Sequence, residues 1–143
     1  MPTPRVSVLA VIRHPATGAL LVNEFYDPTE GVTFHRPCGG GVDWQEPAAH
    51  ALVREFREEF GLAVEVGARL GVIENIFTFN GRHGHEVLFL YAARLAEHAA
   101  YEIERFDCRD VPGEYAIWRA PSVPDDLIPL YPLGLRDLLA EAF

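Results

Sequence analysis

Hydrophobic and polar residues alternate in short runs along most of the chain, a pattern typical of β-strands. Runs rich in β-branched and aromatic residues predict strands at 6–12, 19–25, 33–37, 62–79, 86–95 and 114–119. The turn at 14–18 is expected to join the first two strands as a hairpin. Asn80-Gly81 predicts a tight turn that joins the fourth and fifth strands as a long hairpin. Gly67 and Gly71 predict a bend or bulge within it.

A helical period of 3.6 residues appears directly after the third strand. Because a proline in the first turn of a helix leaves no N–H unpaired, this helix is expected to begin at Glu46 or Pro47 and to end near Gly61. Its apolar face consists of Ala49, Leu52, Val53, Phe56 and Phe60.

A second amphipathic helix is expected to close the chain from about Leu133. Its core-facing residues are Leu135, Leu138 and Leu139. Residues 26–32 and 96–110 are expected to form a surface loop and an irregular segment. The resulting order of strands, one helix, a long hairpin, one more strand and a terminal helix is typical of an α+β fold rather than of a regular βαβ alternation.

Three carboxylates share one face of the first predicted helix, at Glu55, Glu58 and Glu59. Like charges at this spacing destabilise a helix, so a bound cation is a natural way to offset them. Carboxylate oxygens suit Mg²⁺, which also binds water and substrate phosphates. Ala48 and Ala51 are expected to leave space for a ligand on this face. The alternative is a solvated acidic face with no ligand.

The spacing of these residues favours the functional interpretation. The order is Gly40, five residues, Glu46, seven residues, Arg54-Glu55-Phe56, one residue, Glu58-Glu59, one residue, Gly61-Leu62. This segment resembles the Nudix box of the Nudix hydrolases, and the order of strands and helices resembles the family over nearly the whole chain. The resemblance implies a mixed β-sheet sandwiched between α-helices, with the box as a strand-loop-helix unit.

The resemblance also implies roles for the residues of the box. Glu55, Glu58 and Glu59 are expected to be catalytic and to bind one or more Mg²⁺ ions, which Mn²⁺ can replace, together with the carbonyl of Gly39. Which glutamate is the general base differs among family members, and Glu55 is one candidate. Site support is assigned to Gly40, Glu46 and Arg54, the last two as an ion pair that holds loop and helix together; two unrelated surface charges are the alternative.

Three positions depart from the usual box. Phe56 stands where an aliphatic residue is usual, which affects packing. Cys38 stands where a proline commonly precedes the glycines, and Gln45 stands where a glycine often precedes the first glutamate. Cys38 and Gln45 lie in the loop, where they can alter its shape and the substrate preference, but none of the three changes removes a metal ligand.

Residues outside the box are candidates for binding the substrate. Arg36, just before the glycines, is a candidate phosphate contact, with a surface arginine as the equal alternative. Phe79 is one of several aromatic residues that can stack a base, although core packing is the default for such residues. Glu86 is a candidate for a further metal ligand or a substrate contact. Its rivals are Glu102, Glu104 and Asp107.

The box fixes the reaction and not the substrate, because base and sugar are recognised by loops outside it. A proline associated with ADP-ribose hydrolases and a tyrosine associated with dinucleoside polyphosphate hydrolases are both missing about 15 residues after the box. These absences favour a nucleoside triphosphate, including an oxidised or noncanonical one. A nucleotide sugar, a dinucleoside polyphosphate and a non-catalytic nucleotide-binding Nudix sensor stay as alternatives.

Composition narrows the partners and the setting. The length of 143 residues with 49% hydrophobic residues predicts a single globular domain over 1–143. The net charge of -9 argues against nonspecific binding to nucleic acid. The sequence shows neither a signal peptide nor an apolar run of membrane-spanning length, and its two cysteines make no disulfide framework. We therefore expect a cytoplasmic protein with no membrane partner, and a homodimer by analogy with the family.

Overall fold

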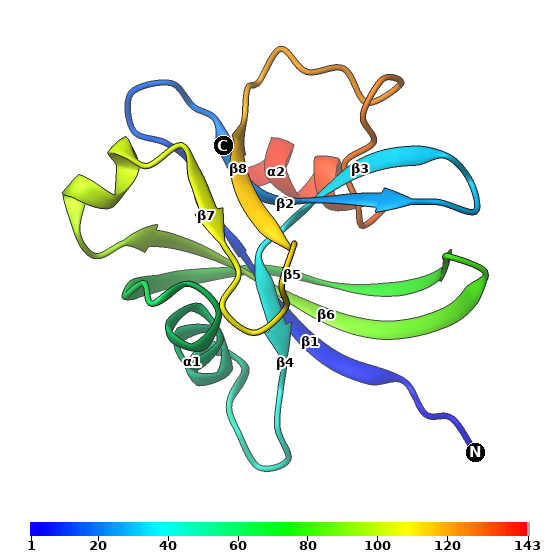
Figure 1. The fold of residues 1–143 in the computed structure, drawn as a ribbon. Coiled ribbons are helices and arrows are strands. Elements are labelled where there is room, and N and C mark those ends of the chain that lie inside the picture. Colours follow the sequence, from blue (N-terminus) through cyan, green and yellow to red (C-terminus); the bar gives the residue numbers. More distant parts are fainter. Residues whose placement is uncertain (143) are drawn as a thin grey trace.

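Two four-stranded sheets form the body of the protein in this computed structural model, which describes residues 1–142 (Figure 1). The first sheet has the order β4-β1-β6-β5 and the second the order β3-β2-β8-β7. The strands are β1 (Arg5–Val11), β2 (Leu20–Asp27), β3 (Val32–Pro37), β4 (Gly39–Gly41), β5 (Val64–Phe79), β6 (Arg82–Leu95), β7 (Arg105–Asp107) and β8 (Tyr115–Arg119). The helices are α1 (Ala48–Phe60), a short 3-10 helix η1 (His98–Glu102) and α2 (Leu135–Ala142).

Strand β1 organises the two cores of the molecule. It runs parallel to β6 and antiparallel to β4, so the first sheet is mixed. Because side chains alternate along a strand, Val8 and Ala10 enter one hydrophobic cluster while Leu9 and Val11 enter another. The first cluster contains residues of α1 and the second contains residues of α2. The predicted α+β fold, with a mixed sheet between helices, is thereby confirmed. The structure adds that the strands form two sheets instead of one.

The turn predicted between the first two strands is present, but the prediction that these strands pair as a hairpin is wrong. The backbone N–H of His14 donates to the carbonyl of Ala19 at 2.7 Å, and Arg13 bridges Leu20, but β1 and β2 then enter different sheets. From Ser7 onward, strand β1 is buried on both faces between β4 and β6, while β2 lies between β3 and β8. The chain changes sheets at this turn because both strands have better partners from distant parts of the sequence.

Helix α1 begins and ends close to where the sequence predicts. Pro47 precedes its first residue, and Gly61 ends it with φ of 65°, a conformation that favours glycine. Buried on this helix are Ala51, Leu52, Phe56 and Phe60. The expectation that Ala51 leaves space for a ligand is wrong, since its side chain is fully buried in the core and faces away from solvent.

The C-terminal half contains one confirmed hairpin and one corrected segment. Asn80 and Gly81, with φ of 50° and 75°, form the two-residue turn between β5 and β6, and the register shifts between Val66 and Gly71. The segment 96–110 is not irregular throughout, because it contains η1 and β7. Helix α2 is present as predicted, and Phe143 lies outside the described residues. Among residues 1–142, no helix has the length and hydrophobicity that crossing a membrane requires.

Candidate active site

The short strand β4 and helix α1 form one unit that places the box carboxylates beside the glycines. A Cβ added at Gly40 would overlap the carboxylate of Glu55, and one at Gly39 would overlap the backbone of Val8. Both positions therefore exclude a side chain on packing grounds. The glycines let the backbone of β4 approach α1 closely enough for Glu55 to lie against it.

Arg54 ties the loop between β4 and α1 to the helix. Its Nε and Nη2 donate to the two carboxylate oxygens of Glu46 at 2.8 and 2.9 Å, and Nη2 also donates to the carbonyl of Gly41 at 3.0 Å. The hydrogen bonds from Arg54 lower the pKa of the Glu46 carboxyl to about 2. The expected ion pair between Glu46 and Arg54 is thus present, in a bidentate geometry.

The same guanidinium also contacts two of the three box carboxylates. Nη1 of Arg54 donates to Oε1 of Glu55 at 3.0 Å and to Oε2 of Glu58 at 3.1 Å. Glu59 lies deeper. Burial and then the negative charge of Glu55 raise the pKa of its carboxyl to about 8. The site therefore holds more negative charge than Arg54 compensates, and a proton or a cation is needed to offset it.

The donors of this site fit a hard divalent cation by their chemistry. Three carboxylates are available on α1, and Gly39 on β4 adds a backbone carbonyl. Within residues 1–142, no three His, Cys, Asp or Glu side chains already surround one point. Glu55 and Glu58 both accept from Nη1 of Arg54, and Glu59 hydrogen-bonds to Glu55. Oxygen ligands suited to a cation are therefore present, although Arg54 lies between two of them.

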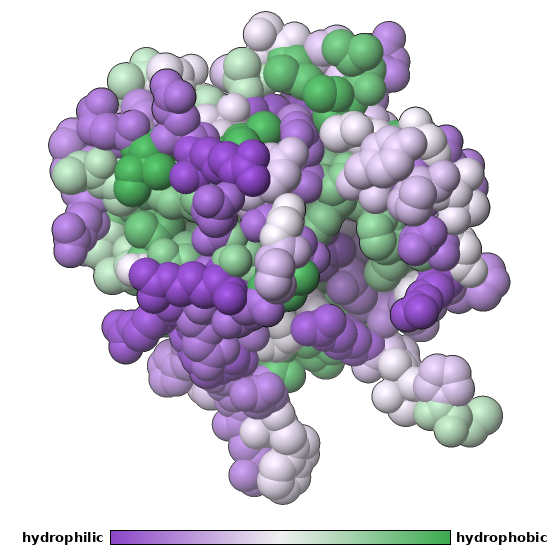
Figure 2. Space-filling view, in the orientation of Figure 1, coloured by the Kyte–Doolittle hydropathy of each residue, from purple (hydrophilic) through white to green (hydrophobic). Residues whose placement is uncertain are grey.

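A cavity of about 800 Å³ opens beside the carboxylates, within the range of small-molecule sites. Gly39, Gly40 and Glu59 line one part of it. Figure 2 shows a hydrophilic surface over α1 and a hollow between the hairpin β2–β3 and the hairpin β5–β6. Aromatic residues that line the cavity are Phe25, Phe34, Phe77, Phe79 and Tyr131.

Four of these aromatic rings form a contiguous cluster. The ring centroid of Phe34 lies 5.3 Å from Tyr131, 5.6 Å from Phe25 and 5.6 Å from Phe79. These rings come from β2, β3, β5 and the segment before α2, so the cluster joins both sheets. Phe79, predicted as a base-stacking residue, is half-buried in it and lines the cavity. Trp44 does not line the cavity, and its side chain is exposed.

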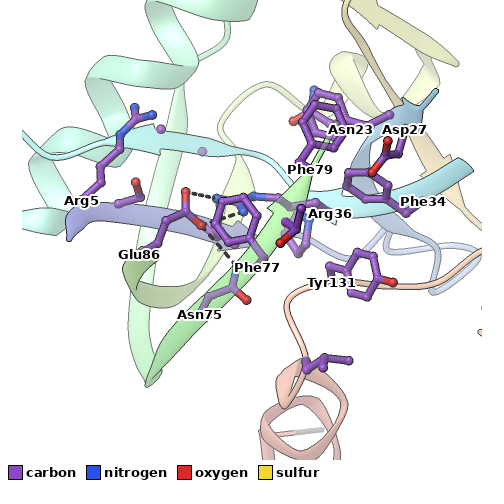
Figure 3. Close-up of a pocket in the computed structure, with 18 of the residues that line it drawn as sticks. Arg5, Asn23, Asp27, Phe34, Arg36, Asn75, Phe77, Phe79, Glu86 and Tyr131 are labelled. Carbon is purple, nitrogen blue, oxygen red and sulfur yellow. Dashed lines mark hydrogen bonds and ion pairs between the residues drawn. The ribbon is translucent and has the colours of Figure 1, made fainter. Parts of the chain in front are cut away.

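Arg36 and Glu86 meet in the wall of the cavity (Figure 3). Nη1 and Nη2 of Arg36 donate to Oε2 and Oε1 of Glu86 at 2.9 and 3.1 Å, and Nδ2 of Asn75 donates to Oε2 at 3.4 Å. The two candidates are thus brought together with each other rather than with the box carboxylates. Their predicted roles toward substrate stay predictions.

The rivals of Glu86 are Glu102, Glu104 and Asp107, and they are exposed and line no part of the cavity. Cavity-lining residues that the sequence interpretation missed include Arg5, Ser7 and Glu114. Glu114 adds to the negative charge that raises the pKa of Glu59, and burial raises its own pKa. A polar Ser7 inside an otherwise apolar buried run was the one signal available in the sequence.

Comparison with known proteins agrees with this geometry. The sequence profile of the NUDIX domain matches residues 3–123. The chain therefore belongs to the Nudix family of hydrolases. A crystal structure of a MutT NUDIX hydrolase from Burkholderia pseudomallei is 28% identical, with a TM-score of 0.67 over 99% of this chain and 100% of that chain.

More distant solved structures share the fold. The solution structure of the E. coli ORF135 protein is 22% identical, with a TM-score of 0.59 over 98% of this chain and 89% of that chain. An ADP-ribose pyrophosphatase from Streptococcus suis is 20% identical, with a TM-score of 0.58 over 98% of this chain and 92% of that chain. No curated protein sequence matches the chain significantly.

Proposed function

We propose that this protein hydrolyses a pyrophosphate bond of a nucleoside triphosphate, including an oxidised or noncanonical one, in the presence of Mg²⁺. One observation carries the proposal: a single cavity contacts Gly39, Gly40 and Glu59 and also contacts the aromatic cluster around Phe34 and Phe79. A nucleotide has the matching chemistry, with an aromatic base and a polyphosphate in one molecule.

The roles proposed for the box follow from its contacts. Glu55, Glu58 and Glu59 would hold the cation, together with the carbonyl of Gly39. A cation bound there supplies charge neutralisation at the phosphates and acidifies the attacking water, with Mn²⁺ as a substitute. Glu55 is our candidate for accepting the proton of that water. Arg54 orients Glu55 through the bond at 3.0 Å and keeps the loop next to the helix through Glu46.

The remainder of the cavity would bind the nucleoside. Phe34 and Phe79, whose ring planes meet at 81°, offer one face and one edge to a base. Arg36 and Glu86 lie in the cavity wall between the box glycines and the aromatic cluster, where they would bind the sugar or a phosphate. Nucleotide sugars and dinucleoside polyphosphates carry the same groups, so they are the competing substrates.

The test is release of phosphate and pyrophosphate from a panel of nucleoside triphosphates, oxidised triphosphates, nucleotide sugars and dinucleoside polyphosphates, with Mg²⁺ or Mn²⁺. The Glu58→Gln variant is run beside the wild type. One dominant substrate whose hydrolysis depends on Glu58 supports the proposal. A nucleotide sugar as the dominant substrate would replace the triphosphate while leaving the reaction class in place.

A non-catalytic nucleotide sensor is the second candidate. The observation in its favour is that Glu55 and Glu58 both accept from Nη1 of Arg54, at 3.0 and 3.1 Å, so this arginine already neutralises part of their charge. A sensor would bind the nucleotide in the same cavity without cleaving it. Equal, metal-independent background rates for the wild type and Glu58→Gln on every compound would favour the sensor.

Three expectations from the sequence stay predictions beside this proposal. They are a homodimer, a cytoplasmic location and a single domain over the whole chain. Size-exclusion chromatography with light scattering measures the first directly.

A further inference from the structure

The cavity is lined by more negative than positive side chains. Its carboxylates belong to Asp27, Glu30, Glu59, Glu86 and Glu114, and the only cations among the described lining residues are Arg5 and Arg36. All 12 basic residues of the chain other than histidine are arginine. A polyphosphate entering this cavity would therefore need an arginine in addition to any metal ion.

Arg36 already forms an ion pair with Glu86. Both of its terminal nitrogens donate to Glu86, so its charge is compensated within the wall. In contrast, the side chain of Arg5 makes no ion pair or hydrogen bond with residues 1–142. In Figure 3 its guanidinium points away from Glu86, although the two residues are register partners in β1 and β6.

The guanidinium of Arg5 lies over the glycine strand. A Cβ added at Gly41 would be 2.6 Å from Nη2 of Arg5, while a Cβ at Gly40 would meet Glu55. Since neighbouring residues of a strand face opposite sides, Arg5 and Glu55 flank β4 from its two faces. Arg5 and Glu55 therefore lie against adjacent glycines, Gly41 and Gly40, of the edge strand β4.

Ser7 lies two residues after Arg5, so it faces the same side of β1. The residue is 1% exposed, and its hydroxyl has no hydrogen-bond partner within the described residues. Buried hydroxyls are normally hydrogen-bonded, so an unpaired one in the wall of a cavity points to a missing acceptor. Ser7 and Arg5 both line the cavity that contains Gly39 and Gly40.

We propose that Arg5 and Ser7 form an anion subsite that binds a phosphate group of the substrate on the face of β4 opposite Glu55. This inference rests on the proposed function, since it assumes a polyphosphate substrate. The guanidinium of Arg5 and the hydroxyl of Ser7 both donate hydrogen bonds to the phosphate oxygens. A phosphate held there lies in the same cavity as Glu59, so one polyphosphate can contact both the subsite and a box carboxylate.

The probe is inorganic tripolyphosphate, titrated calorimetrically with and without Mg²⁺. Arg5→Gln is expected to weaken its binding about tenfold, which corresponds to about 1.4 kcal/mol. Ser7→Ala is expected to weaken it by a smaller factor. Arg69→Gln is the matched control, because Arg69 is exposed on β5, lines no part of the cavity and loses the same charge. Absence of binding to the wild type under both conditions would overturn the subsite.

Gly41→Ala provides a test that keeps every charge. Its new methyl group would displace the guanidinium of Arg5, and the backbone at this position does not require glycine because its φ is not positive. Binding of tripolyphosphate should fall as it does in Arg5→Gln. If Gly41→Ala weakens binding while Arg5→Gln does not, the guanidinium is not the ligand and the proposal fails.

Kinetics separate this inference from the proposed function. With the best nucleotide substrate, KM of Arg5→Gln should rise more than kcat falls, because the subsite acts in ground-state binding. If hydrolysis depends on Glu58 but Arg5→Gln has the same KM and kcat as Arg69→Gln, the proposed function stands and the subsite is wrong. Arg5-dependent binding of tripolyphosphate by a protein that hydrolyses nothing would keep the subsite and remove the hydrolase.

Discussion

Arg36 and Glu86, 50 residues apart in the sequence, form a two-pronged ion pair in the wall of the cavity, at 2.9 and 3.1 Å. Their side chains are only 20% and 10% exposed. Asn75 adds a third hydrogen bond to the same carboxylate. The pair joins β3 of one sheet to β6 of the other, so it fixes the distance between the sheets at the site.

Removing one partner of this pair should leave the other charge buried and uncompensated. We expect Glu86→Gln to lower the free energy of unfolding by about 2–4 kcal/mol, measured by urea denaturation. The double variant Arg36→Met/Glu86→Leu should lose less than Glu86→Gln alone, because neither charge is then buried. A double variant that is less stable than either single variant would contradict this account.

Gly40 should be essential for the position of Glu55. Gly40→Ala places a methyl group where the carboxylate of Glu55 lies, so the carboxylate must move. We expect hydrolysis to fall about a hundredfold, since small displacements of reacting groups have effects of this size. Gly67→Ala is the control, because Gly67 lies at the bulge of β5 and outside the cavity. Equal activity of the two variants would show that Glu55 need not lie there.

Asp27 joins the ends of two hairpins beside the cavity. Its Oδ1 accepts from the backbone N–H groups of Thr29 and Glu30 at 2.9 and 3.3 Å, and Oδ2 accepts from that of Asn80 at 3.1 Å. The carboxylate thereby holds the hairpin β5–β6, which carries Phe79, against the hairpin β2–β3.

Asp27→Ala should release this contact. We expect faster hydrogen exchange at the amide of Asn80, a loss of about 1–3 kcal/mol in the free energy of unfolding and a higher KM. Asp126→Ala serves as the control, since Asp126 is exposed. Unchanged exchange at Asn80 would mean that the two hairpins hold their positions without Asp27.

His35 should make stability depend on pH. Arg119 can only donate, so Nδ1 of His35 accepts its hydrogen bond at 3.0 Å, and Nε2 carries the proton that is donated to Glu24 at 2.9 Å. Burial lowers the pKa of His35 below its ordinary 6.5, and the charge of Arg119 lowers it further, against the raising effect of Glu24. The buried imidazole is therefore held neutral.

A lowered pKa means that the unfolded chain binds the proton more readily. The contribution of His35 to stability is therefore complete above about pH 6.5 and is lost as the pH falls below it, by at most about 1.4 kcal/mol per pH unit. His35→Gln should flatten the stability profile below pH 6.5, and His50→Gln, at an exposed site, should not. A profile that keeps its slope in His35→Gln would rule out this residue as the cause.

Features that depend on neighbouring residues were predictable from the sequence. The ends of α1 follow from Pro47 and Gly61, and the hairpin turn follows from Asn80-Gly81, because local backbone preferences decide both. The spacing of the box likewise identified Glu55, Glu58 and Glu59 as one face of a helix, next to the glycines.

Features that depend on distant pairings were not predictable. The change of sheet after β1 depends on β6, whose residues lie about 80 positions later, so local pattern favoured a simple hairpin. The pairing of Arg36 with Glu86, and the meeting of Arg5, Glu59 and Glu114 in one cavity, depend on the same long-range register. Alternation showed which residues face one side of a strand, but not which strand lies beside it.

The central claim is that the box carboxylates hydrolyse a nucleotide with the help of a divalent cation. The most direct measurement is the single-turnover rate of the best nucleotide substrate, with Mg²⁺ and with EDTA, for the wild type, Glu58→Gln and Glu104→Gln. Glu104 is exposed and does not line the cavity. The account predicts a rate that requires Mg²⁺, falls about a hundredfold or more in Glu58→Gln and stays at the wild-type level in Glu104→Gln. Hydrolysis that is the same in Glu58→Gln, or that persists in EDTA, would contradict it.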